Sequence, residues 1–200
     1  ESIEDLIEDF KFAIDDWFFR SIFEMMQQLI NQLNRFNEQD FPERLVTRSL
    51  ENKLLDHSEI TEYLIFKEHK YSRNLVHKDI NFEVLLVCWQ PGQSAPIHGH
   101  EGEKCWMRIE SGSLQISNYS LISENPLKLE KLSQMDLEPG ALDGPAEIHS
   151  VRNVSNKKAI SLHIYTKPFA ECDVFYPEKG IVERKSLGYD SVDKIPCWVS

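Results

Sequence analysis

The chain has 200 residues, of which 41% are hydrophobic and 28% are charged, as expected for a globular protein with one substantial core. Its formal net charge of −11 argues against nucleic acid and anionic membranes as partners, because the summed field repels polyanions. No run reaches the roughly 20 apolar residues of a membrane span, and the N-terminal residues lack the pattern of a signal peptide. We therefore expect a cytoplasmic single-domain protein over residues 1–200, present as a monomer or a weak homo-oligomer.

Residues 1–57 carry apolar side chains at helical spacing, which predicts an N-terminal helical layer. The apolar positions are Ile3, Leu6, Ile7, Phe10, Ile22, Met25, Met26, Leu29, Ile30 and Leu33. All of them fall on the stripe that a helix uses for docking, so they indicate a packing surface and not a cofactor site. We expect one or two amphipathic helices followed by a shorter one.

From about residue 60 the pattern changes to β-branched and aromatic runs separated by turn residues. The clearest runs are 82–90, 104–110, 113–119 and 158–165. Short strands without helical intervals predict a barrel or a sandwich, with loops at 123–126 and 140–145. The expected fold class is therefore mainly β: a small β-barrel and C-terminal strands over residues 60–200, with the helical layer on its outside.

His98 and His100 occupy alternate positions of a predicted strand. Alternate side chains of a strand point to the same face, so both imidazoles can reach one ion. By itself the His-x-His pattern is weak, because the chain has seven histidines and two solvent-facing histidines in a loop would give the same pattern.

The stretch around these histidines resembles the first motif of the cupin family. The matching positions are Gly92, His98, His100 and Gly112. Where most cupins carry a metal-binding Glu, this chain has Cys105. The second cupin motif supplies a third His followed by Asn, and His149 and Asn153 are similar to that pair. The resemblance implies a cupin (jelly-roll) fold with a metal ion on three histidines.

Three neutral imidazoles leave a ferrous ion with its full dipositive charge, whereas a carboxylate ligand would partly neutralise it, so an anionic thiolate is a favoured further ligand. Over most of residues 60–175 the chain resembles cysteine dioxygenases, which have a cysteine where Cys105 stands. In that family this cysteine can become thioether-linked to a tyrosine that corresponds to Tyr165. The resemblance implies Fe(II) on His98, His100 and His149, in a member of the bacterial type.

Ser161, His163 and Tyr165 alternate with apolar residues along one predicted strand, so all three lie on one face. A buried trio that only satisfies its own hydrogen bonds would give the same pattern. The cysteine dioxygenase resemblance favours a role in managing protons, with the Tyr165 hydroxyl directed at bound ligands, His163 orienting it and Ser161 holding His163.

The segment from Tyr71 to Val76 resembles the part of cysteine dioxygenases that offers an arginine to the substrate carboxylate, which implies substrate-binding roles for Arg73 and Tyr71. A guanidinium makes paired hydrogen bonds to a carboxylate in a fixed geometry. Related bacterial enzymes that prefer mercaptopropionate carry Gln at this position and lack the crosslinking cysteine. One departure is that many animal members have Ser-Pro-Pro after the active tyrosine, where this chain has Thr166, Lys167 and Pro168.

These observations predict an enzyme that oxidises L-cysteine with O2 to cysteine sulfinic acid, with Arg73 and Tyr165 holding the substrate carboxylate. Within the same class the alternative is a dioxygenase acting on 3-mercaptopropionate or cysteamine. In another class the alternative is a non-catalytic metal-binding cupin that binds a ligand or acts as a sensor, because a fold alone does not prove catalysis.

Overall fold

The structure is a computed structural model that describes residues 25–51 and 54–197. Its helical elements are a helix over residues 25–37, α2 (Glu43–Leu50), α3 (His57–Ile60) and the 3-10 helix η1 (Thr61–Tyr63). One sheet has seven strands in the order β13 (Ile195–Pro196), β12 (Ser191–Val192), β1 (Ser72–Lys78), β2 (Phe82–Trp89), β9 (Ala159–Thr166), β4 (Cys105–Ser111) and β7 (Leu142–Asp143). The other has six strands in the order β11 (Ile181–Ser186), β10 (Glu171–Tyr176), β3 (Ser94–Gly99), β8 (Ile148–Arg152), β5 (Leu114–Glu124) and β6 (Leu127–Leu137).

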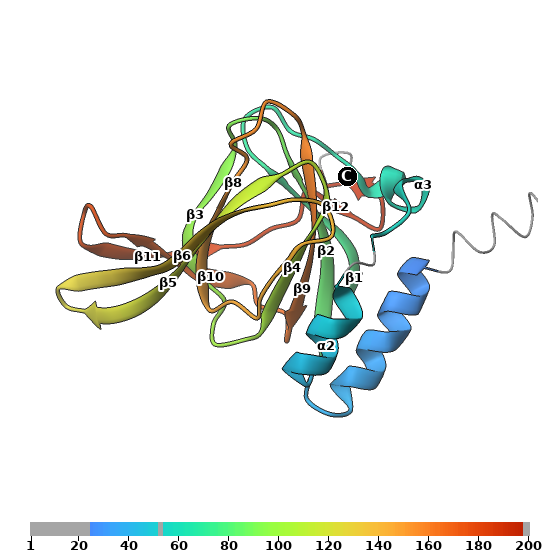
Figure 1. Cartoon of the computed structure of the whole chain (residues 1–200), viewed down its shortest axis with the longest axis horizontal. Coiled ribbons are helices and arrows are strands. Elements are labelled where there is room, and N and C mark those ends of the chain that lie inside the picture. Colours follow the sequence, from blue (N-terminus) through green and yellow to red (C-terminus); the bar gives the residue numbers. More distant parts are fainter. Residues whose placement is uncertain (1–24, 52–53, 198–200) are drawn as a thin grey trace, which may run out of the picture.

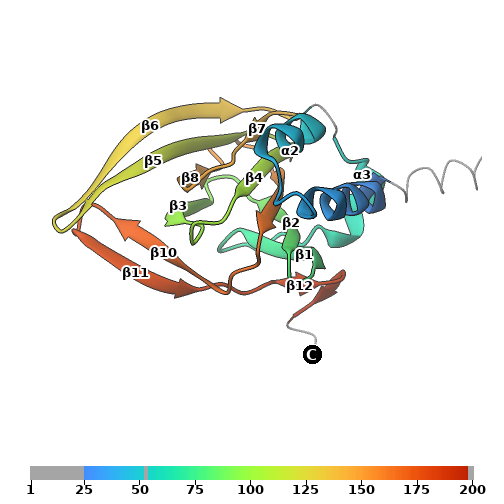
Figure 2. The ribbon, with the colours of Figure 1, turned by 90° about the horizontal axis from the view of Figure 1, so that it is seen from below.

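The expected mainly β fold with an N-terminal helical layer is confirmed (Figure 1). Within residues 25–51 and 54–197 no strand belongs to both sheets, so the expected barrel consists of two separate sheets of a jelly roll and is not closed by strand pairing. Figure 2 shows the β5–β6 and β10–β11 hairpins extending away from the helices on opposite sides of β3 and β8.

The helical layer covers the outer face of the seven-stranded sheet, where it forms one apolar core. Its helical members are Met26, Leu29, Leu33, Val46, Leu50 and Ile60. The sheet contributes even-numbered positions of β2, β4 and β9, among them Phe82, Trp106 and Leu162. The predicted apolar positions from Ile3 to Ile22 lie outside the described residues, whereas those from Met25 to Leu33 lie in the helix over residues 25–37.

A second apolar core fills the space between the two sheets. Here the seven-stranded sheet contributes odd-numbered positions, such as Leu85 in β2 and Met107 in β4, because alternate side chains of a strand point to opposite faces. The six-stranded sheet contributes Ile116 and Val151. Every residue of β2 and β9 is buried, since these strands have a core on both faces. Polar side chains at odd positions of these strands therefore lie inside the jelly roll.

The four predicted strand runs correspond to β2, β4, β5 and β9, although β5 extends to Glu124. Two predicted loops need correction. The loop expected over 123–126 is mostly strand, because β5 pairs with β6 up to Glu124 and only Asn125 and Pro126 form the turn. The loop expected over 140–145 contains β7, which pairs with β4 and places Asp143 opposite Met107. The pairing partner, and not the local composition, makes this short segment a strand.

Candidate metal centre and active site

Three histidines converge on the six-stranded sheet. His98 lies in β3 directly opposite His149 in β8, and His100 follows β3. Their ring centroids are 4.7–5.1 Å apart, and one ligand nitrogen from each ring lies within 4.8 Å of the other two. The structure therefore brings together the three residues that the sequence predicted as metal ligands.

The hydrogen bonds of the three rings fix which nitrogen faces the centre. Each Nδ1 contacts an oxygen that can only accept: His98 to the Pro96 carbonyl at 2.9 Å, His100 to the Ala146 carbonyl at 2.8 Å, and His149 to Asp143 Oδ2 at 3.2 Å. Each Nδ1 therefore carries the proton, and each Nε2 keeps a lone pair. The Nε2 atoms of His100 and His149 are buried without a hydrogen-bond partner, as expected of atoms that bind a metal ion.

The protonation state of the rings also suits a metal. Loss of surrounding water, followed by the charge of His149, lowers the pKa of the His98 imidazole to about 3. The same two effects hold the pKa of His100 well below its usual value. Neutral imidazole is the form that binds metal ions, so His98 and His100 are ready to act as ligands at neutral pH.

Two further residues hold the His149 ring on its Nδ1 side, away from the candidate metal position. Asp143 in β7 contacts its Nδ1, and the side-chain amide of Asn118 donates to the other carboxylate oxygen at 2.9 Å. A carboxylate that accepts from a metal-bound histidine fixes the ring orientation and raises its basicity. Sequence reasoning missed both residues. The available signal was an acidic residue in the segment before His149, which was assigned to a loop.

Ser161, His163 and Tyr165 form a continuous hydrogen-bonded chain on the inward face of β9. Ser161 Oγ lies 2.8 Å from His163 Nε2, and the Tyr165 hydroxyl lies 3.1 Å from His163 Nδ1. The chain begins at Trp89 in β2, whose indole nitrogen donates to Ser161 Oγ at 2.9 Å. The predicted trio is therefore assembled as expected, and Trp89 is a member that the sequence did not reveal.

The direction of this chain can be assigned from donors and acceptors. Burial, with smaller effects of His149 and Arg73, lowers the pKa of His163, so its ring is neutral and has one N–H. If Ser161 donates to Nε2, the Nδ1–H donates to the Tyr165 oxygen and leaves the phenolic proton available to the site. The reverse tautomer would leave the fully buried Ser161 hydroxyl without an acceptor. The first arrangement satisfies more buried groups.

Cys105 in β4 is the direct cross-strand partner of Tyr165. Side chains at such positions have Cβ atoms about 4.5–5.5 Å apart. Burial raises the pKa of the Cys105 thiol, and burial followed by the proximity of Cys105 raises the pKa of the Tyr165 phenol. Both groups are therefore protonated neighbours. Cys105 and the other described buried cysteines, Cys88 and Cys172, are free thiols.

Arg73 enters the same interior from β1. Its guanidinium carbon lies 5.7 Å from the centroid of the Tyr165 ring, and its Nε and Nη2 atoms are buried without hydrogen-bond partners. The C-terminal segment holds its backbone, because Asp190 accepts from the Arg73 N–H at 2.9 Å and donates its own N–H to the Arg73 carbonyl at 2.7 Å. Tyr71 stacks on Trp89 with 4.7 Å between ring centroids. Against the lowering effect of burial, Tyr165 and Tyr71 both raise the pKa of the Arg73 guanidinium, so the three residues predicted to bind the substrate lie close together.

Glu83 is the most unexpected residue of the site. It occupies an odd position of β2, is fully buried and lies directly opposite Tyr165. Its Oε1 atom is 3.6 Å from Arg73 Nη2. The sequence carried a signal for it, since it is the one charged residue in an otherwise apolar strand run, but the run was interpreted only as a strand.

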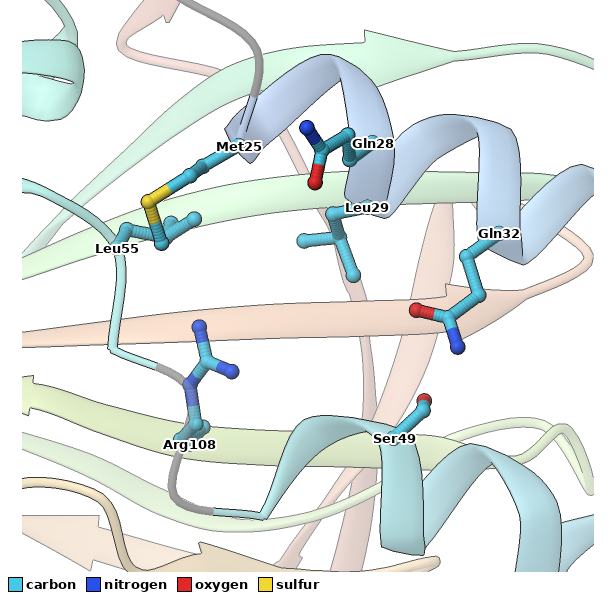
Figure 3. Close-up of a pocket in the computed structure, with 7 residues that line it drawn as sticks. All are labelled: Met25, Gln28, Leu29, Gln32, Ser49, Leu55 and Arg108. Carbon is cyan, nitrogen blue, oxygen red and sulfur yellow. The ribbon is translucent and has the colours of Figure 1, made fainter. Parts of the chain in front are cut away.

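The pockets that lie apart from these residues do not add to the site. A cavity of about 90 Å³ lies between the helix over residues 25–37, α2 and β4, on the opposite face of the seven-stranded sheet. Figure 3 shows Arg108 directed toward that helix from below. No helix in the described part of the chain is long and apolar enough to cross a membrane.

A jelly roll with three inward-facing imidazoles on one sheet defines a cupin with a site able to hold one metal ion. Comparison with known proteins narrows this class. Residues 19–178 match the family model described as Cysteine dioxygenase type I. This match includes every site residue discussed so far except Asp190, and it spans most of the chain. The chain belongs to the cysteine dioxygenase type I family.

Individual members of this family that match the chain have low sequence identity to it. Human cysteine dioxygenase type 1 is 26% identical over 141 residues, which are 68% of this chain and 70% of the human protein. Cysteine dioxygenase type 1 of Danio rerio is 25% identical over 164 residues, covering 78% of this chain and 82% of the relative. A conserved protein with a double-stranded beta-helix domain from Klebsiella pneumoniae aligns with a TM-score of 0.48 and 17% identity, covering 58% of this chain and 94% of that structure.

Proposed function

We propose that this protein is a ferrous thiol dioxygenase that converts L-cysteine and O2 to cysteine sulfinic acid. The observation that carries the proposal is the meeting of two sets of unpartnered buried atoms in one interior. One set is the lone-pair nitrogens of His100 and His149, and the other is the guanidinium donors of Arg73. The first set suits a metal ion and the second suits a carboxylate, so together they fit a small carboxylic acid that also binds the metal, as a thiol acid can.

His98, His100 and His149 would hold the iron. Their donor set fits ferrous iron, because three neutral imidazoles without a carboxylate leave the ion dipositive and open to an anionic thiolate. Bound iron would supply the coordination of the thiolate and the activation of O2. Asp143 would keep the His149 ring in the orientation that presents Nε2 to the ion.

Arg73 would orient the substrate through its carboxylate. Its Nε and Nη2 atoms can donate a pair of hydrogen bonds in a fixed geometry, and both are desolvated already. Tyr71 and Tyr165 lie close to this guanidinium and would complete the carboxylate pocket. Fixing the carboxylate on the seven-stranded sheet directs the thiol toward the histidines on the opposite sheet, which is catalysis by positioning.

Tyr165 would supply a proton to the reacting oxygen and sulfur atoms. Its raised pKa keeps the phenol protonated, and the Ser161–His163 chain leaves that proton free to donate. His163 and Ser161 act through Tyr165 and are positioning residues.

The adjacency of Cys105 and Tyr165 supports the thioether link that occurs in the family. Joining the cysteine sulfur to the phenol ring removes two protons and two electrons, which O2 accepts, and we predict that the bond forms during turnover. Mass spectra of peptides after exhaustive turnover should show Cys105 joined to Tyr165. A Cys105 thiol that stays wholly open to alkylation would contradict the proposed placement.

The central test is oxygen uptake by iron-loaded protein. With L-cysteine the expected product is cysteine sulfinic acid, and activity should follow iron content and not zinc or manganese. Relative turnover of L-cysteine, 3-mercaptopropionate and cysteamine separates the three dioxygenase alternatives. Tight metal binding without oxygen uptake on any of the three would instead favour a non-catalytic cupin that binds or senses a ligand. The expected cytoplasmic location, the monomeric or weakly oligomeric state and the bacterial type stay predictions.

A further inference from the structure

The buried carboxylate of Glu83 has no role in the proposed chemistry, yet it lies inside the site. It is fully buried, and the neighbours that β-pairing gives it are Tyr165 in β9 and Lys78 in β1. A buried carboxylate is costly unless charges and hydrogen bonds compensate it. The contacts of Glu83 therefore show which groups compensate its buried charge.

The two oxygens of Glu83 have different environments. Oε2 accepts a hydrogen bond from the Tyr189 hydroxyl at 2.5 Å and lies 3.6 Å from Lys78 Nζ, which in turn donates to the Tyr189 hydroxyl at 2.7 Å. Oε1 faces Arg73 Nη2 at 3.6 Å and has no hydrogen-bond partner. One oxygen is anchored by the C-terminal segment, while the other presents negative charge to the guanidinium.

The distance between Arg73 and Glu83 balances the charge of the guanidinium but leaves its hydrogen-bond donors free to bind a ligand. At 3.6 Å the pair is too long for a hydrogen bond, so the Nε and Nη2 donors stay open to a ligand. The opposite charges nevertheless cancel at a short distance in a region without water. Lys78 adds little to this balance, because its side chain is 40% exposed and solvent screens its charge.

We propose that Glu83 determines the charge class of the substrate. It offsets Arg73, so the pocket recognises a carboxylate by hydrogen-bond geometry without carrying a net positive charge of its own. A site with Arg73 alone would favour thiols whose only other charge is a carboxylate. The balanced pair favours a thiol that carries an amino group together with the carboxylate. This inference rests on the proposed function, in which Arg73 binds the substrate carboxylate.

The variant Glu83→Gln tests the inference, because it keeps the size and the hydrogen-bond acceptor for Tyr189 while it removes the charge. Specificity constants are measured for 3-mercaptopropionate, L-cysteine and cysteamine. We expect the value for 3-mercaptopropionate to rise about tenfold relative to that for L-cysteine, and the value for cysteamine, which carries an amine and no carboxylate, to fall. If the specificity constants for the anionic and the cationic thiol change in opposite directions, the cause is the lost charge of Glu83. A loss of packing would lower both values.

Two control variants separate charge from structure. Tyr189→Phe removes the anchor of Oε2 and leaves the carboxylate in place, so the ranking of the three thiols should stay within about twofold of wild type. Glu83→Asp retains the charge and should keep the wild-type order. If Glu83→Gln fails to fold, Glu83→Asn provides a shorter neutral side chain for the same comparison. Equal changes for all three thiols in the neutral variants, or the same shift in Tyr189→Phe, would overturn the proposal.

A binding measurement keeps this inference separate from the proposed function. Propionate and ethylamine carry the two charges without a thiol, and their affinities for the iron-loaded protein can be measured by calorimetry. Glu83→Gln should tighten propionate binding and weaken ethylamine binding. If wild-type protein oxidises no thiol, the proposed function fails, and these affinities still decide whether Glu83 sets the charge preference. Unchanged affinities for both compounds would refute the inference.

Discussion

Two buried arginine–glutamate pairs lie on opposite faces of the same sheet. Arg108 and Glu110 both belong to β4 and point toward the helical layer, with 2.6 Å between Nε and Oε1. Glu110 Oε2 accepts the Leu55 N–H at 2.8 Å, and Arg108 Nη1 donates to the Leu50 carbonyl at 2.9 Å. This pair ties the end of α2 and the segment after it to the sheet, and four of its five charged side-chain atoms make these bonds. Only Nη2 of Arg108 is buried without a partner.

Arg73 and Glu83 form the inward pair and differ in how their atoms are used. Their contact is longer, 3.6 Å, and Arg73 Nε, Arg73 Nη2 and Glu83 Oε1 are all without hydrogen bonds. A protein interior rarely leaves so many buried polar atoms unpaired unless a ligand completes them. The comparison teaches that the same two residue types can join parts of the fold where their atoms are bonded, whereas the inward pair leaves its atoms open for the ligand that we propose.

The largest expected effect is on stability and concerns the outward pair. Arg108→Met leaves the Glu110 carboxylate buried without its cation, which typically costs about 3–5 kcal/mol of unfolding free energy. Chemical denaturation measures this loss. Burial already raises the pKa of Glu110, so the loss should shrink at acidic pH, where the carboxyl is neutral, and grow as pH rises.

The double replacement Arg108→Met with Glu110→Leu is the control. It removes both charges and should recover most of the lost stability. Turnover per folded molecule should stay at the wild-type value in both proteins, because the pair faces away from the histidines. A loss of turnover in folded protein would contradict the division between the two faces.

On the inward face, Tyr165→Phe should lower turnover by about 10²–10⁴, the usual contribution of a positioned proton donor. The Michaelis constant for L-cysteine should change much less, because the hydroxyl acts mainly on the reacting atoms. Steady-state kinetics decide between the two effects. An unchanged turnover with a raised Michaelis constant would assign Tyr165 to binding only.

Arg73→Ala should reduce the specificity constants for L-cysteine and 3-mercaptopropionate by about 10- to 100-fold, since a charge-assisted hydrogen bond contributes roughly 1.5–3 kcal/mol. Cysteamine has no carboxylate and should lose little of whatever activity it has. Arg73→Gln keeps hydrogen-bond donors but leaves the Glu83 charge unbalanced, so the specificity constant for 3-mercaptopropionate should fall more than that for L-cysteine. Equal losses for all three thiols would mean that Arg73 supports the fold, as Arg108 does.

The last prediction concerns a third buried carboxylate, Asp143, which lies beside the three histidines and would act on metal binding and not on the substrate carboxylate. Asp143→Ala should weaken iron binding by about 10- to 100-fold, as is typical for a residue that orients a metal-bound histidine. Iron occupancy at limiting metal is the measurement. Asn118→Ala, one contact further out, should have a smaller effect. Full occupancy in Asp143→Ala would remove this residue from the site.

Sequence alone determined the features that depend on neighbours along one strand. Period-two alternation is local, so it placed Ser161, His163 and Tyr165 on one face and gave His98 and His100 a common direction. The resemblance to known motifs added His149, Cys105 and Arg73, and the structure brings all of them into one interior.

Only the tertiary structure decided which strands became neighbours, and the missed contacts all cross between different strands. Trp89 reaches Ser161 because β2 pairs with β9, and Asp143 contacts His149 between the two sheets, because β7 pairs with β4 at the edge of the seven-stranded sheet while β8 belongs to the six-stranded one. Glu83 meets Arg73 because β1 and β2 pair and both side chains point inward. An isolated Glu in an apolar run indicates that its buried charge needs a partner, but the pairing of the strands determines which residue that partner is.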